Sequence, residues 1–500
     1  MRLFYQHKGN TEGVIMKKTK DFWLLFLCFY AQAAIGQSLT KQQMYADFDT
    51  LVATIARVSP HIPIKKDLWH YDALAEMQKR RQQIDTVTND FSFFILLEKV
   101  LNLAQDMHTS SWELTGKMAE QDKIYRQRRN GFFRFSFGHK YIDGKYIVTS
   151  PFIVGNDTIE IGSEVTHFNG KTVDNYIQSH LDSRYGYVYD LKKKKFYGLG
   201  FFKNLETIFQ DSLHIVFKNR KGQSKSYTIP TTQFTKFLPT KNTEGGDTTR
   251  VELWQNEKVL YIKLTKMDPD YLPYLQKEIW KQRENTANID KIIIDFRGNS
   301  GGEDTTWQTL YSEILPDKIS YPLKIDDLKN SRVNKGMIEN AGLPALLQRD
   351  NTPFLEKYNF YTLTNSVQTI EPLSTSIKFK GKIFVLVENH YSSTGSALVV
   401  PNANPKDKFY SVGRKTGYFL GVGFSPIQFV LPHSGFRFRI APSIEVSNAK
   451  NLKELMHDNI EIEIPDSIEE LTIRANYNGS LHSKAYLLSH DPFIKTVMQF

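Results

Sequence analysis

Cysteine is nearly absent from this sequence of 500 residues, in which Cys28 is the single instance. Cys28 lies in an N-terminal segment that we expect to be removed, so the mature chain has neither a disulfide nor a thiol nucleophile. The 13 histidines show no ligand pairing of the H-x-x-x-H kind with nearby acids. We therefore expect no metal site, and the sequence calls for no other cofactor.

A large charge excess is also missing. The chain has 64 basic and 54 acidic residues, a formal net charge of +10, and apart from Lys192–Lys195 the surplus is spread along its length. No nucleic-acid-binding motif accompanies it, so we expect a solvated surface and no nucleic-acid partner. With 40% apolar residues, the composition is that of a globular protein with length for two or three domains. The oligomeric state cannot be predicted from these features.

No apolar run is long enough to span a bilayer. Lysines precede the apolar run Phe22–Tyr30 and small residues follow it as far as Gly36, which is the pattern of a signal peptide. A membrane helix needs roughly 20 apolar residues, so a short membrane anchor is the weaker interpretation. We expect cleavage of residues 1–36 and export to the periplasm or the extracellular space, with no stable membrane span afterwards. Translation starts at Met1 or Met16.

Helical spacing dominates the first part of the mature chain. Apolar residues recur every three or four positions between residues 44 and 55, and a further helix begins near Asn89 or Asp90, both good N-caps. This second helix ends in the polar cluster Asp106–Thr109. On residue type alone, His108 is a helix cap or a surface residue, and Asp106 could simply pair with it.

Short alternating apolar runs replace the helical period from about Gly131 to Pro239. The pairs Asp143-Gly144 and Asn169-Gly170 supply hairpin turns between them. This pattern predicts a small β-rich module. The polar stretch Lys241–Arg250 then predicts a linker.

The remainder begins as a βαβ unit. A strand at Val259–Leu264, a helix at Tyr271–Arg283 and a strand at Lys291–Asp295 predict a parallel sheet, whose ligands bind at the carboxyl ends of its strands. Residues 318–369 show no strong period, and we expect them to form a helical excursion over the sheet. Ile383–Val387 predicts another buried strand.

A glycine-rich turn follows the strand that ends at Asp295. Three glycines between residues 298 and 302 allow a tight turn with exposed N–H groups, which suits an anion. Asp295 and Arg297 are costly beside a buried strand unless they pair, so we expect them to brace each other or the turn. Two acidic residues follow Gly302 where a phosphate-binding loop has a lysine and a hydroxyl, which argues against a phosphate.

Ser393 follows the strand Ile383–Val387 and precedes an apolar segment that can begin a helix. A serine at such a junction can act as a nucleophile, because its hydroxyl is exposed and the helix N-terminus stabilises negative charge. The alternative is that the serine merely caps the helix. A G-x-S-x-G sequence is absent, so this is not a hydrolase elbow of that type.

In their order and spacing, these motifs resemble the C-terminal processing peptidases, in the branch similar to the tricorn core and the interphotoreceptor retinoid-binding repeats. The matching residues are Asp106, His108 and Thr109; the insert at 161–171; Asp295, Arg297, Asn299, Gly301 and Gly302; and Val385–Ser396. The resemblance implies an α/β fold with a ClpP/crotonase-like catalytic core, an N-terminal helical region and an inserted PDZ-like β domain. The expected divisions are a signal peptide at 1–36, a helical domain at 38–128, a PDZ-like domain at 129–240 and a serine peptidase core at 250–500.

The resemblance also implies a role for each matching residue. Ser393 is the nucleophile, His108 is the general base, and Glu445 or Glu454 orients the histidine. The oxyanion hole is formed by Gly301, Gly302 and Thr394, and the site is supported by Asp295, Arg297, Asn299 and Asp106. The chain departs from the family at Ser396, where a glutamate is usual, and Lys415 leaves a Ser–Lys dyad open.

The implied function is that of an exported serine peptidase, either an endopeptidase or a tail-specific protease, acting on peptides or unfolded proteins. The alternative is a catalytically inactive protein on the same scaffold that binds a peptide or a lipid.

Overall fold

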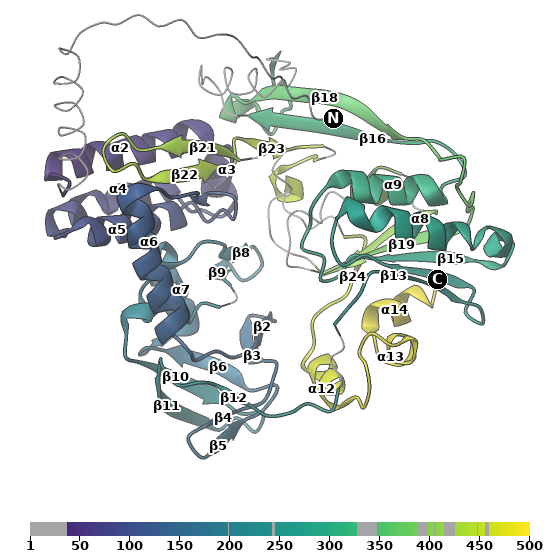
Figure 1. Ribbon diagram of the computed structural model, residues 1–500, viewed down its shortest axis with the longest axis horizontal. Helices are drawn as coiled ribbons and strands as arrows, with labels where there is room; N and C mark the ends of the chain where they lie inside the picture. Colours follow the sequence, from purple (N-terminus) through teal and green to yellow (C-terminus); the bar gives the residue numbers. More distant parts are fainter. Residues whose placement is uncertain are drawn as a thin grey trace, which may run out of the picture.

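The computed structural model describes the chain in nine stretches, which are 38–198, 200–242, 246–327, 348–388, 398–404, 407–414, 426–447, 449–455 and 460–500. Figure 1 shows a helical region, a β-rich region below it and an α/β core beside them, joined along the top by a long pair of strands. The expected signal peptide lies outside the described residues. No helix in the stretches above is long and apolar enough to cross a membrane.

The helical region forms the start of the described chain. Its helices are α2 (Lys41–Val58), α3 (His61–Leu68), α4 (Ala73–Lys79), α5 (Asp90–Asn102) and α6 (Gly116–Gln127), with a 3₁₀ turn at Arg81–Thr86. Capping boxes at Thr40 and at Asn89 start α2 and α5, the second of them at one of the two predicted residues. The apolar faces of these helices share one buried core, to which Phe48, Leu51 and Phe94 belong with no exposed surface.

A small sheet ties the far end of the chain to this helical region. Its order is β1-β22-β21, made of β1 (Ser110–Ser111), β22 (Arg437–Ile440) and β21 (Ile427–Val430), all antiparallel. Buried Asp47 on α2 accepts hydrogen bonds from the backbone N–H groups of His433 and Ser434, at 3.0 and 2.7 Å. Residues 427–440 therefore leave the core and pack beside the helices (Figure 1).

The β-rich region has three antiparallel sheets. The six-stranded sheet has the order β11-β10-β6-β3-β2 with β7 on β6, a second sheet has the order β12-β4-β5, and β8 pairs with β9. The strands are β2 (His139–Ile142), β3 (Lys145–Val148), β4 (Phe152–Val154), β5 (Asp157–Ile159), β6 (Glu164–Phe168), β7 (Lys171–Thr172), β8 (Val188–Asp190), β9 (Lys195–Tyr197), β10 (Ser212–Lys218), β11 (Ser224–Pro230) and β12 (Lys236–Phe237). Helix α7 (Val173–Ser179) follows β7. The predicted Asp143-Gly144 turn joins β2 to β3, with both residues at positive φ.

The core is a six-stranded sheet of order β13-β14-β15-β19-β20-β24. Its strands are β13 (Arg250–Trp254), β14 (Val259–Lys263), β15 (Lys291–Asp295), β19 (Lys382–Val387), β20 (Phe409–Gly413) and β24 (Ile462–Glu463). All neighbours are parallel except β13, which is antiparallel to β14. The predicted βαβ unit and α/β class are thus confirmed.

Helices cover both faces of this sheet. One face packs against α8 (Leu272–Trp280) and α9 (Asp304–Ile314), and the other against α13 (Lys484–Ser489) and α14 (Pro492–Val497), as Figure 1 shows. Along β15, Ile292 and Ile294 face the first pair, whereas Ile293 faces the second. A strand that is buried on both faces needs apolar residues without alternation, which explains the isoleucine run. Two further helices are α11 (Val399–Ala403) and α12 (Ile468–Asn476).

The helical excursion expected at 318–369 is wrong. The described parts of this segment form β16 (Ile319–Asp327), β17 (Gln348–Arg349) and β18 (Tyr361–Ile370), and β23 (Ser443–Glu445) joins them in the order β17-β18-β16-β23. In β16, apolar residues recur at every second position from Ile319, which is the period of a strand. The pair β16–β18 reaches from the core toward the helical region (Figure 1).

Candidate active site

The turn after β15 is held by a buried ionic cluster. Asp295 is 1% exposed, and its carboxylate accepts hydrogen bonds from Arg297 at 2.7 and 3.0 Å and from the hydroxyl of Tyr261 at 2.8 Å. Lys263 lies 3.4 Å from Asp295 and also donates to the carbonyl of Arg297. Burial alone would raise the pKa of Asp295, but Arg297 and Lys263 hold it well below its usual range. The expected bracing of this turn by Asp295 and Arg297 is present.

Removing the charge of Asp295 should destabilise the protein strongly. Asp295→Asn leaves Arg297 and Lys263 beside a neutral amide, with Asp491 at 2.7 Å and Asp247 at 3.0 Å as their remaining ionic partners among the described residues. Losing one partner of a buried pair typically costs about 3–5 kcal/mol. We expect a loss of that size in the free energy of unfolding at pH 7, measured by urea denaturation. The ionised carboxylate stabilises the fold above about pH 4, where the unfolded residue is also ionised, and this contribution is lost as the pH falls further.

Asp290→Asn is the matched control for this prediction. Asp290 forms an ion pair with Lys258 at 3.6 Å in which both side chains are about 60% exposed, and such surface pairs contribute at most about 1 kcal/mol. Equal stability losses in the two variants would show that the buried cluster does not hold the turn.

The glycines of the turn differ in what their N–H groups do. Buried Asn299 donates to the carbonyl of Leu264 at 2.9 Å, and its side-chain oxygen accepts the N–H of Gly301 at 2.7 Å. Gly301 is buried, whereas Gly302 is exposed and its N–H has no recorded partner among the described residues. Of the two predicted oxyanion donors, Gly302 is therefore the one whose N–H is left without a partner by the residues that the structure describes.

Close packing fixes the position of Gly302. Its φ is +139°, and a Cβ there would lie 2.0 Å from the carbonyl oxygen of Met267. The N–H of Met267 donates to Gly301 at 3.0 Å, and the N–H of Glu303 donates to Met267 at 2.8 Å. Only glycine fits at this position, so the free N–H keeps one orientation.

The predicted nucleophile follows the neighbouring strand in the sequence. Ser393, Thr394 and Ser396 lie outside the described residues, as does Lys415, so their side chains are not placed. The strand before them, β19, is parallel to β15, with Leu386 opposite Asp295. Both strands therefore end at the same edge of the sheet, where the glycine turn follows β15, and in the sequence Ser393 comes soon after the end of β19.

An ion network holds the end of β19. Glu388, the last described residue before Ser393, lies 2.7 Å from Arg414 at the end of β20 and 3.2 Å from Lys140 on β2. Burial would raise the pKa of Glu388, but Lys140 and Arg414 lower it to about 2. Lys140 also lies 3.0 Å from Asp466. The ion pair between Lys140 and Glu388 connects the β-rich region to the end of β19, the strand that precedes Ser393 in the sequence.

His108 sits on the turn between α5 and β1. The Asp106 carboxylate accepts the His108 backbone N–H at 3.0 Å and the Thr109 hydroxyl at 2.7 Å, so the D-x-H-T sequence closes its own turn. The ring Nδ1 of His108 lies 3.9 Å from Asp106, and its side chain is 28% exposed. Partial burial lowers the pKa of His108 below its ordinary value, against the raising effect of Asp106. The imidazole is therefore neutral at pH 7, as a general base requires.

Two residues that the sequence did not single out lie behind His108. Lys65 is buried and donates to the carbonyls of Ala104 and Gln105, at 3.0 and 2.8 Å. Burial lowers the pKa of Lys65 to about 8 and that of neighbouring His61 to about 4. Burial would raise the pKa of Asp106, but the charges of His61, Lys65 and His108 lower it to about 2. This cluster fixes the turn that carries His108.

The two acidic candidates lie in different places. Glu445 ends β23, and burial raises its pKa to about 7, with a further contribution from Asp304 at the start of α9. Asp304 is two residues after Gly302, so Glu445 lies near the glycine turn. The start of β23 also borders the helical region, because the backbone of Ser443 forms a hydrogen bond with His61. Strand β23 thus borders both parts of the site, although no contact between Glu445 and His108 is found among the described residues.

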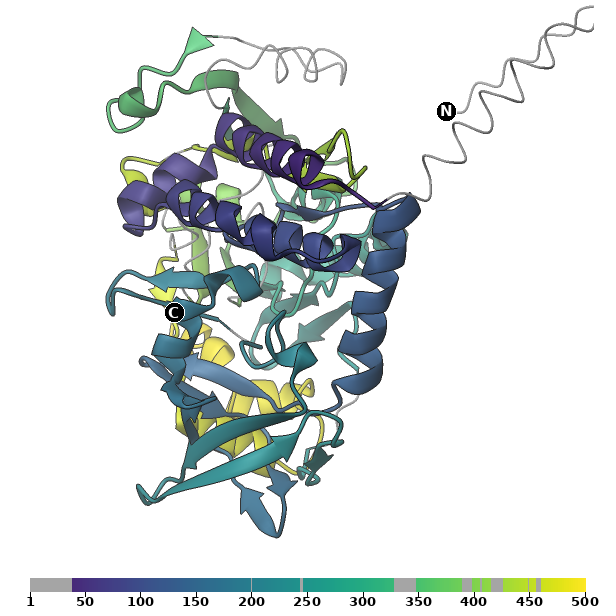
Figure 2. The same ribbon diagram turned by 90° about the vertical axis from the view of Figure 1, so that its left-hand side faces the viewer.

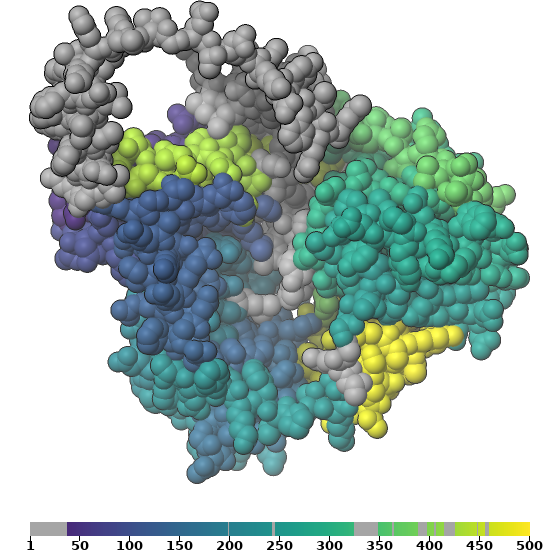
Figure 3. All heavy atoms as spheres, in the orientation of Figure 1, coloured from purple at the N-terminus to yellow at the C-terminus, as the bar shows by residue number. Residues whose placement is uncertain are grey.

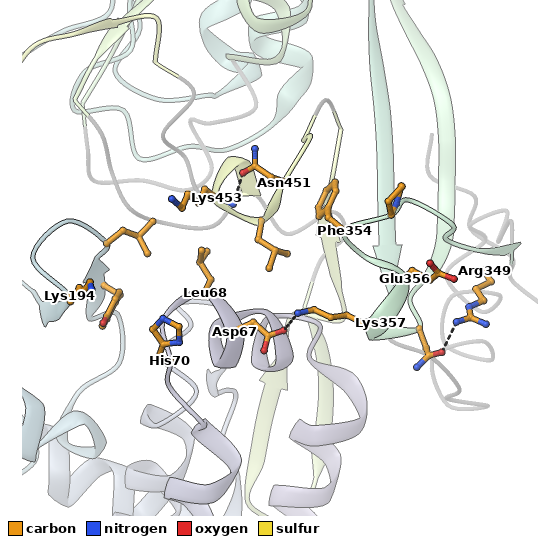
Figure 4. A pocket seen from close by; sticks show the side chains of 15 residues that line it. Asp67, Leu68, His70, Lys194, Arg349, Phe354, Glu356, Lys357, Asn451 and Lys453 are labelled. Carbon is orange, nitrogen blue, oxygen red and sulfur yellow. Dashed lines mark hydrogen bonds and ion pairs between the residues drawn. The ribbon is translucent and has the colours of Figure 1, made fainter.

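Glu454 instead accepts hydrogen bonds from the Lys450 N–H at 2.8 Å and the Asn451 amide at 2.7 Å, within its own turn. Asn451 lines a cavity of about 1100 Å³ between α3, the β8–β9 pair and residues 349–359, where Lys357 pairs with Asp67 at 2.6 Å (Figure 4). Neither His108 nor Gly302 lines this cavity. The arrangement favours Glu445 over Glu454.

Comparisons with known proteins agree on the fold. Residues 258–445 match the model of peptidase family S41. Mature CPAF aligns with a TM-score of 0.57 and 11% identity, and mature CPAF complexed with lactacystin with a TM-score of 0.56 and 12% identity; each alignment covers 92% of this chain and 98% of the other. A photosystem II D1 C-terminal processing protease aligns over 90% of this chain and 99% of its own with 13% identity and a TM-score of 0.39. No curated protein sequence gives a significant match.

The matched region runs from β14 to the end of β23. It contains Gly302, Ser393 and Glu445, whereas His108 comes from the helical region outside it. The sheet β1-β22-β21 joins these two parts of the chain, since β22 belongs to the match and β1 follows His108.

Proposed function

We propose that this protein, whose residues 258–445 match the model of peptidase family S41, is a serine-type peptidase, and that it is an exported endopeptidase or tail-specific protease that uses Ser393 as nucleophile and His108 as general base. The observation that carries this proposal is the common edge of β15 and β19. The turn with Gly302 follows β15 at this edge and Ser393 follows β19 in the sequence, so we infer that the two lie side by side.

Each group then has a chemical task. His108, neutral because burial lowers its pKa, takes the proton of the Ser393 hydroxyl as this oxygen attacks the peptide carbonyl, and later returns it to the leaving amine. The N–H groups of Gly302 and Thr394 donate to the oxyanion of the tetrahedral intermediate. Glu445 orients the imidazole, and Asp106 holds the backbone of His108.

The β-rich region is proposed to act as a PDZ-like module that holds the peptide by adding it as a strand. The ion pair between Lys140 and Glu388, which links this region to the sheet edge where β15 and β19 end, supports this role. Residues 1–36 are proposed to direct export and to be removed.

Hydrolysis of an unfolded protein, such as reduced and alkylated casein, tests the proposal through its pH dependence. We expect kcat/KM to rise with pH on a limb whose midpoint lies below the ordinary histidine value of about 6.5, because the protonated imidazole cannot accept the serine proton. Absence of hydrolysis at every pH would favour the inactive binding protein. A midpoint near 8 or above would favour the Lys415 dyad instead.

A further inference from the structure

A second cavity lies directly beside His108. It has a volume of about 440 Å³ and is enclosed by β1, the ends of α5 and α6, residues 183–185 and 203–205 of the β-rich region, and Arg439 on β22. Ser110 lines it and is two residues from His108, so the cavity begins within about 7 Å of this residue along the chain. Figure 2 shows α6, in blue, running from the helical region toward the β-rich region.

Cations outnumber available carboxylates around this cavity. Five cationic side chains line it, against three carboxyl groups. Asp122 is already paired with Arg126 at 2.5 Å, and burial raises the pKa of Glu98 to about 7, so that this carboxyl group is partly protonated near neutral pH. The cations without an ion pair to any described carboxylate are Arg129, Arg184, Lys203 and Arg439.

These cations crowd one another. Partial burial lowers the pKa of Lys203, and the neighbouring charges of Arg129 and Arg134 lower it further. Arg439 is held in place, since its Nε donates to the Ser110 hydroxyl at 3.2 Å and its guanidinium stacks on Trp112 at 4.0 Å. A group of cations that outnumbers the ionised carboxylates around it is a binding site for an anion.

The surroundings indicate what carries that anion. Met107, which precedes His108 in the sequence, and Trp112 are each 36% exposed, and Tyr185 is 43% exposed. Trp112 and Tyr185 also line the cavity. An apolar surface next to the general base suits a peptide. The nearby carboxyl groups of Glu98 and Glu113 disfavour a multiply charged phosphate but tolerate a single negative charge.

We propose that this cavity is a specificity pocket that takes the acidic side chain of an Asp or Glu residue in the bound peptide. This inference rests on the proposed peptidase function. Arg129, Arg184 and Lys203 bind the carboxylate, and Trp112 and Tyr185 cover its methylene groups. The peptidase therefore selects cleavage sites at a fixed distance from an acidic residue.

A randomised peptide library with acetylated N-termini and amidated C-termini tests this, because its only carboxylates are Asp and Glu side chains. We expect cleaved peptides to be enriched about 10-fold or more in Asp and Glu at one position relative to the cleaved bond, as charge-assisted hydrogen bonds allow. Arg129→Gln and Arg184→Gln should each reduce the enrichment. Arg128→Gln is the matched control, because Arg128 lies outside the cavity with its guanidinium over Phe209 at 5.4 Å and should leave the enrichment unchanged.

Cleavage without acidic enrichment, or enrichment that persists in Arg129→Gln and Arg184→Gln, would overturn the pocket while leaving the peptidase intact. A preference seen only with free C-termini would overturn it in favour of a chain-end site. If no peptide is cleaved, the proposed function fails, and the pocket is then judged by which library peptides bind to Ser393→Ala. Retention of Asp- and Glu-containing peptides that depends on Arg184 would support the pocket, and retention independent of acidic residues would overturn it.

Discussion

His108→Ala is expected to lower kcat for peptide hydrolysis by at least about 10³-fold, with little change in KM. The imidazole takes the serine proton in the transition state but contributes little to substrate binding, and serine peptidases lose activity on this scale without their base. The helical region should stay folded, because His108 is 28% exposed and its turn is closed by Asp106. Steady-state kinetics and the melting temperature of the variant measure both points.

His167→Ala is a suitable control, because His167 is exposed on β6 in the β-rich region. We expect its kinetics to match those of the original protein. If His108→Ala keeps its activity while Lys415→Ala loses it, the base is the lysine, and the role given to His108 is wrong.

Gly302→Ala is expected to lower kcat by roughly 10²–10³-fold, the usual effect of losing one oxyanion donor. The added Cβ would lie 2.0 Å from the Met267 carbonyl oxygen at a φ of +139°, so the turn must shift and move its free N–H. Substrate binding should change much less, because the N–H acts mainly on the charge that develops in the transition state.

Gly298→Ala provides the matched control in the same turn. Gly298 also has a positive φ, +73°, but nothing lies within 4 Å of a Cβ there. This variant should lose about 1–2 kcal/mol of stability through backbone strain and keep most of its kcat. Equal losses of kcat in the two variants would show that the turn as a whole, rather than the N–H of Gly302, is required.

The elements that could be predicted from the sequence are those whose signals are local. Asn89 marks the start of α5 because its side chain caps the helix, and the isoleucines of β15 mark a strand buried on both faces. The bracing of the glycine turn followed from the cost of leaving Asp295 and Arg297 unpaired. In each case a few adjacent residues carry the whole physical reason.

Other features depend on partners distant in the sequence. The alternation in β16 is the period of a strand, but its stability comes from pairing with β18 and with β23, more than 110 residues further along the chain. Nothing near residues 427–440 indicates that they pair with β1. For the same reason the cluster of Lys65 and His61 behind His108 could not be found, since it forms only when α3 packs against the end of α5.

The candidate site divides in the same way. From the sequence, Gly301 and Gly302 were equally good candidates for the oxyanion donor. The structure distinguishes them, because the N–H of Gly301 donates to the side chain of Asn299. The sequence did not distinguish Glu445 from Glu454 as the residue that orients the histidine. The position of Glu445 near Asp304 favours Glu445. Figure 3 shows the helical and β-rich regions on one side and the core on the other, so a site that draws on both depends on tertiary packing.

Reaction with a fluorophosphonate probe tests the central claim most directly, because the probe forms a covalent bond only with an activated serine. On protein lacking residues 1–36, we expect mass spectrometry to find the label on Ser393, with none in Ser393→Ala and much slower labelling in His108→Ala. Failure of the folded original protein to react, or a label on another serine, would contradict the assignment of Ser393 and His108 as the catalytic pair.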